Sequence, residues 1–381
     1  MEKTFEKKKT YNSWGAKAAK SVMQRKPVIN PKMKWEYEDG VVLEGMYLLW
    51  KQTGDSEYLD YIQRNLDLFV DGVGNIPKYS AEEFNIDHVN NGKILLDLYK
   101  ETKDERYKKA VDLLRNQLRR HPRTKEGSFW HKQIYPYQVW LDGLYMGSVF
   151  YGKHVHFFGK EEDWEDVINQ FLLCEKNTKD NKTGLLHHAY DERRVQPWAD
   201  KQTGLSRHYW GRSIGWFAMA LVDVLDYLPE NNEKRERLIE MLRDVLDAVM
   251  QVQDKETSLW YQIMDQGTRK GNYLESSCSC MFLYSIAKGV RKGYLGEKWF
   301  EIAEKIYEGI LDEFITETKE GYINVNKICY VGGLGGADKR DGSFAYYISE
   351  PIVTNDHKGV GPFILASAEM EWLNNNNKVK N

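Results

Sequence analysis

The chain has 381 residues, of which 41% are hydrophobic and 13% aromatic, and its formal net charge is −3. This length allows one large architecture or two average domains, and the near balance of acidic and basic residues argues against nucleic acid or a membrane surface as the main partner. No stretch reaches the ~18 apolar residues of a membrane span.

Apolar residues recur at helical spacing through most of the chain, and one pattern returns six times. A small or acidic residue opens an apolar helix rich in Gly, Ala and Ser, and a charged amphipathic helix stands beside it in the sequence. The apolar segments are 40–50, 87–96, 142–150, 211–221, 275–283 and 359–366. Their charged partners are 14–23, 56–69, 105–118, 162–173, 233–252 and 298–314.

Repeated helical hairpins can form an open solenoid or a closed ring. The repeats here vary in length and the terminal ones carry no obvious polar cap, which favours closure. No linker or composition break divides the chain. The sequence therefore predicts an all-α fold, an (α/α)6 barrel of twelve helices, as a single domain over residues 1–381.

The connections between these helices differ in length. Segments that lead into the apolar helices are long and rich in aromatic, His and Arg residues, whereas the reverse turns at 51–55 and 101–104 are short. The 12 Trp and 24 Tyr also exceed what a core needs, and clustered aromatic residues often line sugar sites. One rim of the barrel is therefore predicted to carry function, with helix N-termini that suit an anionic ligand.

Two aspartates open apolar helices and are the candidate catalytic groups. Asp142 follows the aromatic segment 135–140, and Asp87 opens the preceding apolar segment. Either side chain can be read as a helix N-cap. Ring closure would nevertheless bring both carboxylates, and Glu275 of the fifth segment, to one cavity, and two carboxylates suffice for acid–base chemistry on a sugar.

Other candidates stand beside these openings. His131 and Lys132 precede Asp142 in a long aromatic loop and can bind a substrate carboxylate or hydroxyl. Arg212 is suited to bind a carboxylate through two parallel hydrogen bonds, and Trp216 to stack on a sugar. Alternatively, Arg212 can pair with a structural carboxylate and Trp216 can fill the core. Trp210 opens the same helix.

Two further stretches carry polar or flexible residues. His187 and His188 are adjacent, so in extended chain only one of them can face the cavity. The run 332–336 (Gly-Gly-Leu-Gly-Gly) lacks the Lys and Ser/Thr of a phosphate-binding loop and does not open a helix after a strand. It is expected to be a rim loop that closes over substrate, with Gly333 at the binding site.

Four pieces of sequence, in this order, resemble glycoside hydrolase family 105, the unsaturated rhamnogalacturonyl hydrolases. They are 130–132 (Trp-His-Lys), 140–146 (Trp-Leu-Asp-Gly-Leu-Tyr-Met), 184–191 (Gly-Leu-Leu-His-His-Ala-Tyr-Asp) and 210–216 (Trp-Gly-Arg-Ser-Ile-Gly-Trp). The second is the most specific, and the hairpin pattern around them covers nearly the whole chain. The resemblance implies an (α/α)6 barrel that acts on lyase-generated pectin oligosaccharides ending in a 4,5-unsaturated galacturonate.

The resemblance also implies roles for residues. Asp142 would protonate C4 of the enol ether and help to deliver water to C5, after which the hemiketal opens and the neighbouring sugar, often rhamnose, is released. Asp87 would orient the sugar or the water, and Tyr37 is a weaker match. No metal or organic cofactor is implied. The residues expected to surround the unsaturated uronate are His131, Lys132, His188, Trp210, Arg212 and Trp216.

Three other functions compete with this one. An unsaturated glucuronyl hydrolase of the neighbouring family 88 performs the same chemistry on glycosaminoglycan fragments, and a sugar-binding toroid would perform none. A sugar epimerase of the same barrel type usually needs opposed histidines, which adjacent His187 and His188 do not offer. The expected partner is an oligosaccharide, bound by a monomer or a simple homo-oligomer.

Cellular location is read from the N-terminus and the cysteines. Residues 1–9 have charges with no apolar run after them, so no signal peptide is expected. No neighbouring residues complete a four-ligand metal set around the cysteines, so they are expected to be buried free thiols in a cytoplasmic protein. They are Cys174, Cys278, Cys280 and Cys329.

Overall fold

The computed structural model describes residues 13–337 and 340–377. Segment 1–9, on which the expectation about a signal peptide rests, lies outside them. The outer helices of the described chain are α1 (Trp14–Arg25), α3 (Ser56–Leu66), α5 (Glu105–Arg120), α7 (Asp163–Thr178), α9 (Arg235–Gln251) and α11 (Lys298–Phe314). The inner helices are α2 (Tyr37–Thr53), α4 (Gly92–Thr102), α6 (Val149–Phe158), α8 (Gly211–Val224), α10 (Ser276–Arg291) and α13 (His357–Asn377).

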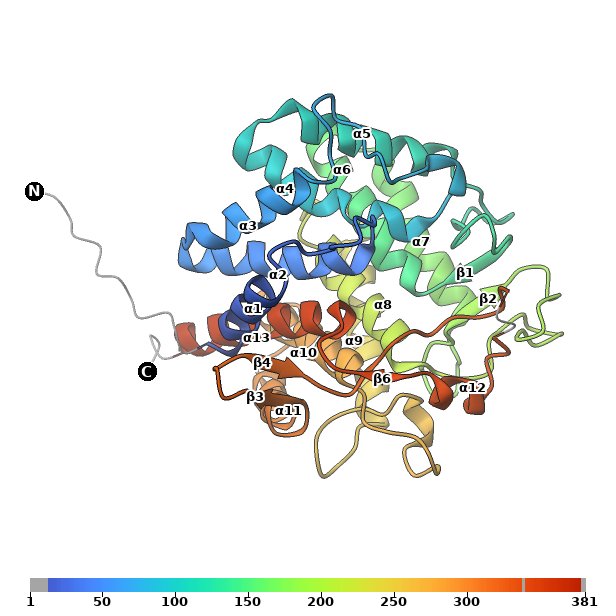
Figure 1. Ribbon diagram of the computed structural model, residues 1–381. Helices are drawn as coiled ribbons and strands as arrows, with labels where there is room; N and C mark the ends of the chain where they lie inside the picture. Colours follow the sequence, from blue (N-terminus) through green and yellow to red (C-terminus); the bar gives the residue numbers. More distant parts are fainter. Residues whose placement is uncertain (1–12, 338–339, 378–381) are drawn as a thin grey trace, which may run out of the picture.

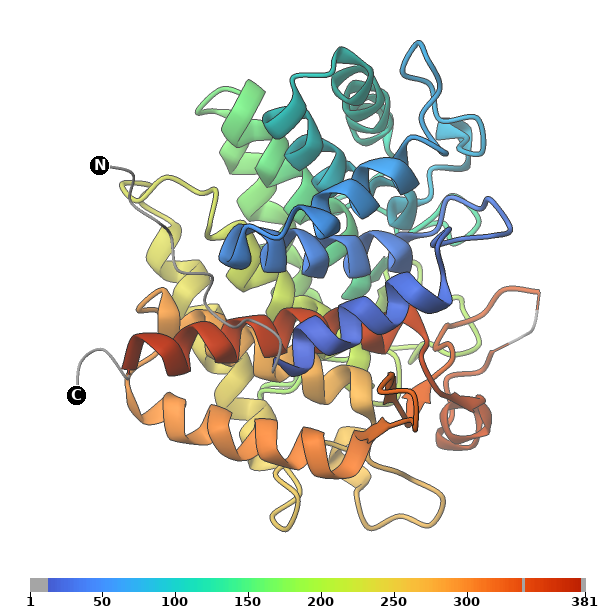
Figure 2. The same ribbon diagram turned by 60° about the vertical axis from the view of Figure 1, so that its left-hand side comes forward.

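The predicted α/α barrel is confirmed. Inner helices contact their neighbours around the ring, and α13 at the end of the chain packs against both α1 and α2 at its beginning. Figures 1 and 2 show this closure, with red α13 beside blue α1 and α2. A continuous cluster of buried apolar side chains runs from Ala18 to Leu373. None of the described helices combines the length and apolar composition that a membrane span requires.

Glycines allow the first and last inner helices to approach closely. A Cβ atom on Gly361 of α13 would lie 2.7 Å from Val41 Cγ1 and 3.0 Å from the Val42 backbone nitrogen of α2. Gly45 of α2 faces Ile364 of α13 in the same way, at 2.8 Å. The small residues that the sequence shows in the inner helices therefore set the spacing at the point of closure.

We expect Gly361→Ala to reduce the free energy of unfolding by about 1–3 kcal/mol, because the added methyl group meets backbone that cannot rotate away. Helix propensity alone would favour alanine by about 1 kcal/mol, so a net loss reports the clash. Urea unfolding measures the effect. Gly296→Ala, where a Cβ meets nothing within 4 Å, is the matched control; equal stabilities of the two variants would contradict this view of the closure.

The short turns are encoded locally. Between α2 and α3, Gly54 adopts a left-handed conformation (φ 70°) and the Asp55 side chain accepts a hydrogen bond from the Glu57 amide. Between α4 and α5, Lys103 (φ 59°) and Asp104 repeat the arrangement. A left-handed C-cap followed by an aspartate N-cap reverses the chain within two residues.

The long connections gather on the other rim, and those that carry β1, β2 and α12 are on the right in Figure 1. They contain elements that helical periodicity did not predict: three two-stranded antiparallel sheets, among the described residues, and several short helical turns. The sheets pair β1 (Gln138–Trp140) with β2 (Ala189–Asp191), β3 (Ile315–Glu317) with β4 (Ile323–Val325), and β5 (Ile328–Cys329) with β6 (Ile352–Val353). The turns are η1 (Ala81–Glu83), η2 (Ile86–Val89), the π-helical η3 (Leu144–Ser148), η4 (Met264–Gln266) and α12 (Phe344–Ser349).

Candidate active site

The β1–β2 sheet sets Asp142 and His188 side by side. Trp140 at the end of β1 pairs with Ala189 at the start of β2, and the Leu141 amide donates to the His188 carbonyl at 3.2 Å. The next residue after Leu141 is Asp142. Its carboxylate Oδ2 lies 3.5 Å from His188 Nε2, and the two side chains are 13% and 0% exposed.

Asp142 does not cap its helix, and that interpretation was wrong. In the described structure no backbone amide donates a hydrogen bond to the Asp142 carboxylate, because the carboxylate turns toward His188. The chain continues instead into the π-helical turn η3, a feature often found at functional sites. Asp142 Oδ2 and His188 Nε2 are both buried and face each other at 3.5 Å, and neither makes a hydrogen bond in the described structure.

Tyr347 of α12 holds the other side of the imidazole. Its hydroxyl lies 2.7 Å from His188 Nδ1, and its side chain is fully buried. Burial raises the pKa of Tyr347 well above its ordinary value, so the hydroxyl keeps its proton and can donate it to Nδ1. The ring atom of His188 that faces Asp142 is then Nε2.

Asp87 occupies a different electrostatic setting. It lies on η2, where Asn85 provides the cap, so Asp87 is not the N-cap of α4. Its carboxylate lies 2.7 Å from Lys132 Nζ and 3.7 Å from His131 Nε2. Burial opposes ionisation of Asp87, but Lys132 and His131 outweigh it and lower the Asp87 pKa. Asp87 is therefore an ionised carboxylate at neutral pH.

Backbone contacts explain why η2 meets the loop before Asp142. The Ile86 amide donates to the His131 carbonyl at 3.1 Å, and the His131 amide donates to the Gln138 carbonyl at 2.8 Å. His131 is 4% exposed, and burial lowers its pKa to about 4. His131 is thus neutral at neutral pH, and the charge beside Asp87 comes from Lys132.

Trp140 connects the two acidic groups. Its ring stacks on His131 (4.4 Å between centroids, 9° between planes) and meets His188 edge-on at 5.2 Å. Tyr135 stacks on it as well, at 5.1 Å. Trp140 stands in the motif 140–146, but the sequence did not single it out as a site residue. Its position between His131 and His188 depends on the β1–β2 pairing.

Arg212 and Glu275 form a structural unit beneath the rim. Arg212 is 1% exposed and donates to the Cys329 carbonyl at 2.5 Å. Glu275 is fully buried and accepts hydrogen bonds from the Cys278 and Cys329 amides and from Ser277. Glu275 therefore caps α10 and anchors β5, so the expectation that it faces the cavity was wrong.

The tryptophans of the fourth opening are core residues in this structure. Trp216 has no exposed surface and lies between Tyr145, which stacks on it at 4.6 Å, and Tyr37, edge-on at 6.2 Å. Trp210 is 1% exposed and donates from its indole to Gln262 at 3.0 Å. Both rings support the site from below, whereas Tyr37, at the start of α2, is half-buried.

The glycine run crosses the site from Trp210 to Tyr135. A Cβ on Gly332 would lie 2.3 Å from the Trp210 ring, and one on Gly336 would lie 3.2 Å from the Tyr135 hydroxyl. Gly333 lies between them and donates from its amide to the Tyr346 hydroxyl at 2.9 Å. His187 points away from this region, with Nδ1 2.6 Å from the Ser206 carbonyl oxygen, so of the two adjacent histidines only His188 reaches Asp142.

Tyr347→Phe should reduce kcat about tenfold or more, because removing a partner that orients a functional side chain typically costs 10–100-fold. If Tyr347 fixes the His188 tautomer, its loss also moves the pH–rate profile, which a purely structural defect does not. Steady-state rates across pH test this. Tyr307→Phe on the outer helix α11 is the control, and identical profiles for the two variants would contradict the role of Tyr347.

The remaining observations concern metals and thiols. Within the described ranges, no group of three or more His, Cys, Asp or Glu side chains is arranged to hold a metal ion. The cysteines are unpaired and buried, as the sequence predicted. At the rim the structure brings together two carboxylates in unlike surroundings: Asp87 is ion-paired with Lys132, and Asp142 lies beside His188.

Comparison with known proteins identifies the family to which this chain belongs. The family model of Glycosyl Hydrolase Family 88 matches residues 8–374. A solved structure of a family 105 glycoside hydrolase from C. acetobutylicum ATCC 824 is 53% identical, with a TM-score of 0.93 over 94% of this chain and 99% of that one. The resemblance to family 105 is thereby confirmed. The unsaturated glucuronyl hydrolase of Bacillus sp. GL1, 14% identical with a TM-score of 0.69 over 94% of this chain and 95% of that one, shares the fold.

Two curated proteins add to this comparison. The unsaturated rhamnogalacturonyl hydrolase YesR of Bacillus subtilis (strain 168) is 28% identical over 284 residues, which is 73% of this chain and 76% of that protein. Protein Atu3128 of Agrobacterium fabrum is 37% identical over 230 residues, 59% of this chain and 97% of that protein.

Proposed function

The chain matches the model of Glycosyl Hydrolase Family 88 and belongs with the family 105 enzymes through its 53% identity to one of them, and on this premise we propose that it is an unsaturated rhamnogalacturonyl hydrolase. Its substrate would be a pectin oligosaccharide left by a lyase, ending in a 4,5-unsaturated galacturonate. The observation that carries the proposal is the pair of buried, unpartnered atoms Asp142 Oδ2 and His188 Nε2, 3.5 Å apart. The 28% identity to YesR supports the choice of substrate.

In the proposed reaction the Asp142 carboxyl group gives its proton to C4 of the enol ether. Positive charge then develops at C5 and on the ring oxygen, and a water adds to C5 while Asp142 accepts a proton from it. The resulting hemiketal opens to a C5 ketone, and the hemiacetal at C1 releases the neighbouring sugar. One water is consumed in each turnover, and Asp142 ends protonated as it began.

The electrostatics support this division of labour. Asp87 cannot easily serve as the acid, because Lys132 holds it ionised. Its fixed negative charge can instead accept hydrogen bonds from sugar hydroxyls or from the attacking water. Asp142 has no cationic side chain in direct contact, and His188 is placed to share its proton. Lys132, 23% exposed, is available to the substrate carboxylate.

The remaining site residues are proposed to act at a distance or through the backbone. Arg212 fixes β5, and Trp216 supports Tyr37, so that their substitution changes the shape of the site. Gly333 provides backbone without a side chain where a Cβ would lie 2.5 Å from Arg340. We propose further that the chain forms a single catalytic domain in the cytoplasm. The continuous core and the unpaired buried cysteines support this.

A substrate comparison tests the proposal. The full-length enzyme is offered lyase-digested rhamnogalacturonan and lyase-digested glycosaminoglycan, and loss of the ultraviolet absorbance of the conjugated uronate is followed. We expect a higher kcat/KM on the rhamnogalacturonan products. A preference for the glycosaminoglycan products would indicate an unsaturated glucuronyl hydrolase, and binding without absorbance loss would indicate a sugar-binding toroid; either result contradicts the proposal.

A further inference from the structure

Lys93, near the start of α4, is a buried cation that the proposed reaction does not use. Its side chain is 2% exposed, and its ammonium nitrogen makes no hydrogen bond in the described structure. Glu44 supplies the counter-charge, with Oε2 3.1 Å from Lys93 Nζ. The other neighbour is aromatic, because the centroid of the Tyr145 ring lies 3.4 Å from Nζ. Attraction between the ammonium group and the face of this ring therefore takes the place of the missing hydrogen bonds.

The Tyr145 ring is held on both of its faces. A nitrogen atom 3.4 Å from the ring centroid has to lie over a face, because the atoms of the ring edge would keep it farther away. Trp216 stacks on the ring with 4.6 Å between centroids and 30° between planes, which leaves it the opposite face. The Tyr145 hydroxyl donates a hydrogen bond to Glu44 at 3.2 Å. Lys93, Glu44 and Trp216 together thus fix the position of this side chain.

Tyr145 is connected to Asp142 through the backbone, because it follows Asp142 by three residues and belongs to the π-helical turn η3. Turns of this kind are rare and are often found at functional sites. On the other side of Asp142, the Leu141 amide is anchored to the His188 carbonyl. The backbone that carries Asp142 is therefore held before this residue by the β1–β2 sheet and after it by Tyr145.

Trp216 extends the contact from Tyr145 to Tyr37. Its ring is fully buried and meets the Tyr37 ring edge-on at 6.2 Å. Burial raises the pKa of Tyr37 well above its ordinary value, and the charges of Asp87 and Asp142 act in the same direction. Tyr37 thus lies close enough to both carboxylates to feel their charge. Because a close-packed interior transmits displacements, a shift of the Tyr145 ring would reach Tyr37 as well as Asp142.

We propose that Lys93 is a positioning residue, which holds the Tyr145 ring and through it the alignment of Asp142. Lys93 is buried and needs no contact with the substrate for this role. The inference rests on the proposed function, because the alignment of Asp142 affects the rate only if Asp142 takes part in the reaction. A misplacement of about 1 Å can lower a catalytic rate about 10²-fold, even when the substituted residue is far from the chemistry.

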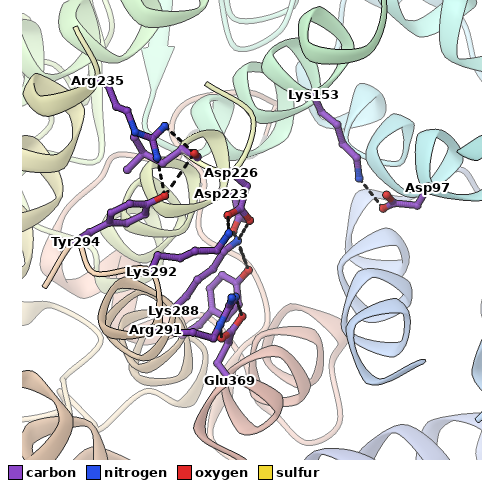
Figure 3. Close-up of polar contacts among 12 residues, drawn as sticks. Asp97, Lys153, Asp223, Asp226, Arg235, Lys288, Arg291, Lys292, Tyr294 and Glu369 are labelled. Carbon is purple, nitrogen blue, oxygen red and sulfur yellow. Dashed lines mark hydrogen bonds and ion pairs between the residues drawn. The ribbon is translucent and has the colours of Figure 1, made fainter. Parts of the chain in front are cut away.

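Lys153 of α6 is the matched control for Lys93. Its side chain is 4% exposed, and it pairs with Asp97 at 2.5 Å, as Figure 3 shows. The aromatic ring beside its ammonium group is that of Tyr227, at 5.5 Å. Substitution of either lysine therefore removes one buried ion pair and one positive charge. Of the two lysines, Lys93 is the one that contacts the Tyr145 ring.

Lys93→Met keeps a long side chain and removes its charge. We expect kcat on the unsaturated oligosaccharide to fall about tenfold or more, and the pH–rate profile to shift because Asp142 moves relative to His188. Lys153→Met should keep the wild-type kcat and profile, although both variants lose stability. The measurements are steady-state rates across pH, normalised to the folded fraction from urea unfolding. A Lys93→Met variant with the wild-type kcat, or with an unshifted profile, would overturn the proposal.

A double variant keeps the proposal testable if Lys93→Met does not fold. Glu44→Gln combined with Lys93→Met leaves no unpaired charge at this position, and loss of a whole buried ion pair is often tolerated. The double variant should keep the lowered kcat, because the Tyr145 ring still lacks its cation. A return to the wild-type kcat would assign the loss to the unpaired Glu44 and overturn the proposal. A wild-type enzyme that does not act on the unsaturated oligosaccharide would instead contradict the proposed function, and this proposal with it.

Discussion

Replacing Asp142 by asparagine is expected to lower kcat on the unsaturated oligosaccharide by about 10²–10⁴-fold, the usual contribution of a positioned general acid. Asparagine has nearly the same shape but no proton to give to C4. Because Asp142 makes no capping hydrogen bond, the fold should not depend on it. The rate is measured from the loss of ultraviolet absorbance, and the unfolding midpoint is measured beside it.

Asp265→Asn is the matched control for this prediction. Asp265 is an exposed aspartate in η4, and its substitution should leave kcat unchanged. An Asp142→Asn variant that keeps most of the wild-type rate would show that another group protonates the substrate. In that case the assignment of the acid is wrong, although the family of the enzyme is not affected.

The second large effect is expected in the pH dependence of stability. His121, His131 and His154 are at most 5% exposed, and burial lowers the pKa of each to about 4. In the unfolded chain a histidine has a pKa of about 6.5. As the pH falls from 6.5 toward 4, the unfolded chain therefore binds protons that the folded protein does not, and stability is lost.

The expected loss of unfolding free energy is large. Each of these histidines should cost about 2 kcal/mol at pH 5 relative to pH 7.5. The three together approach the whole stability of an ordinary domain, about 5–15 kcal/mol. Carboxylates with lowered pKa values, such as Asp87 and Asp226, add their loss only at lower pH, below about 4. Because the carboxylates contribute only below about pH 4, the difference in unfolding free energy between pH 7.5 and pH 5, measured in urea, reports the contribution of the histidines.

Two histidines on α6 provide the test. His154→Gln removes a buried titrating group, so the difference in unfolding free energy between pH 7.5 and pH 5 should shrink by about 2 kcal/mol. His156 is exposed on the same helix, and His156→Gln should keep the wild-type difference. If His154→Gln shows the wild-type pH dependence, the acid sensitivity has another origin.

Local signals made the barrel predictable. Apolar periodicity located the outer helices to within a few residues at most ends, as for the predicted 298–314 and the observed α11. Gly54 and Asp55 marked a turn through their own conformational preferences. The closure of the ring was inferred from the absence of terminal caps, and the glycine contact between Gly361 and Val41 shows what makes it possible.

The site was only partly predictable, because its geometry depends on contacts between distant segments. Tyr347 reaches His188 across 159 positions of sequence, and no local pattern marks it. The β1–β2 pairing, which brings His188 to Asp142, involves strands of three residues that are too short for a periodicity signal. The sequence also could not distinguish Glu275, a buried cap of α10, from Asp87 and Asp142, the carboxylates at the rim.

The proton transfer to C4 can be followed directly by running the reaction in D2O and examining the product by NMR. Protonation by Asp142 from one side of the ring predicts that absorbance falls in step with sugar release, and that one deuterium enters C4 on a single face. Direct cleavage of the glycosidic bond would release the sugar before the absorbance falls. The released unsaturated uronate would then rearrange to the ketone in solution without the enzyme. Deuterium would enter C4 from either side, and a mixture of the two stereoisomers at C4 would contradict the account.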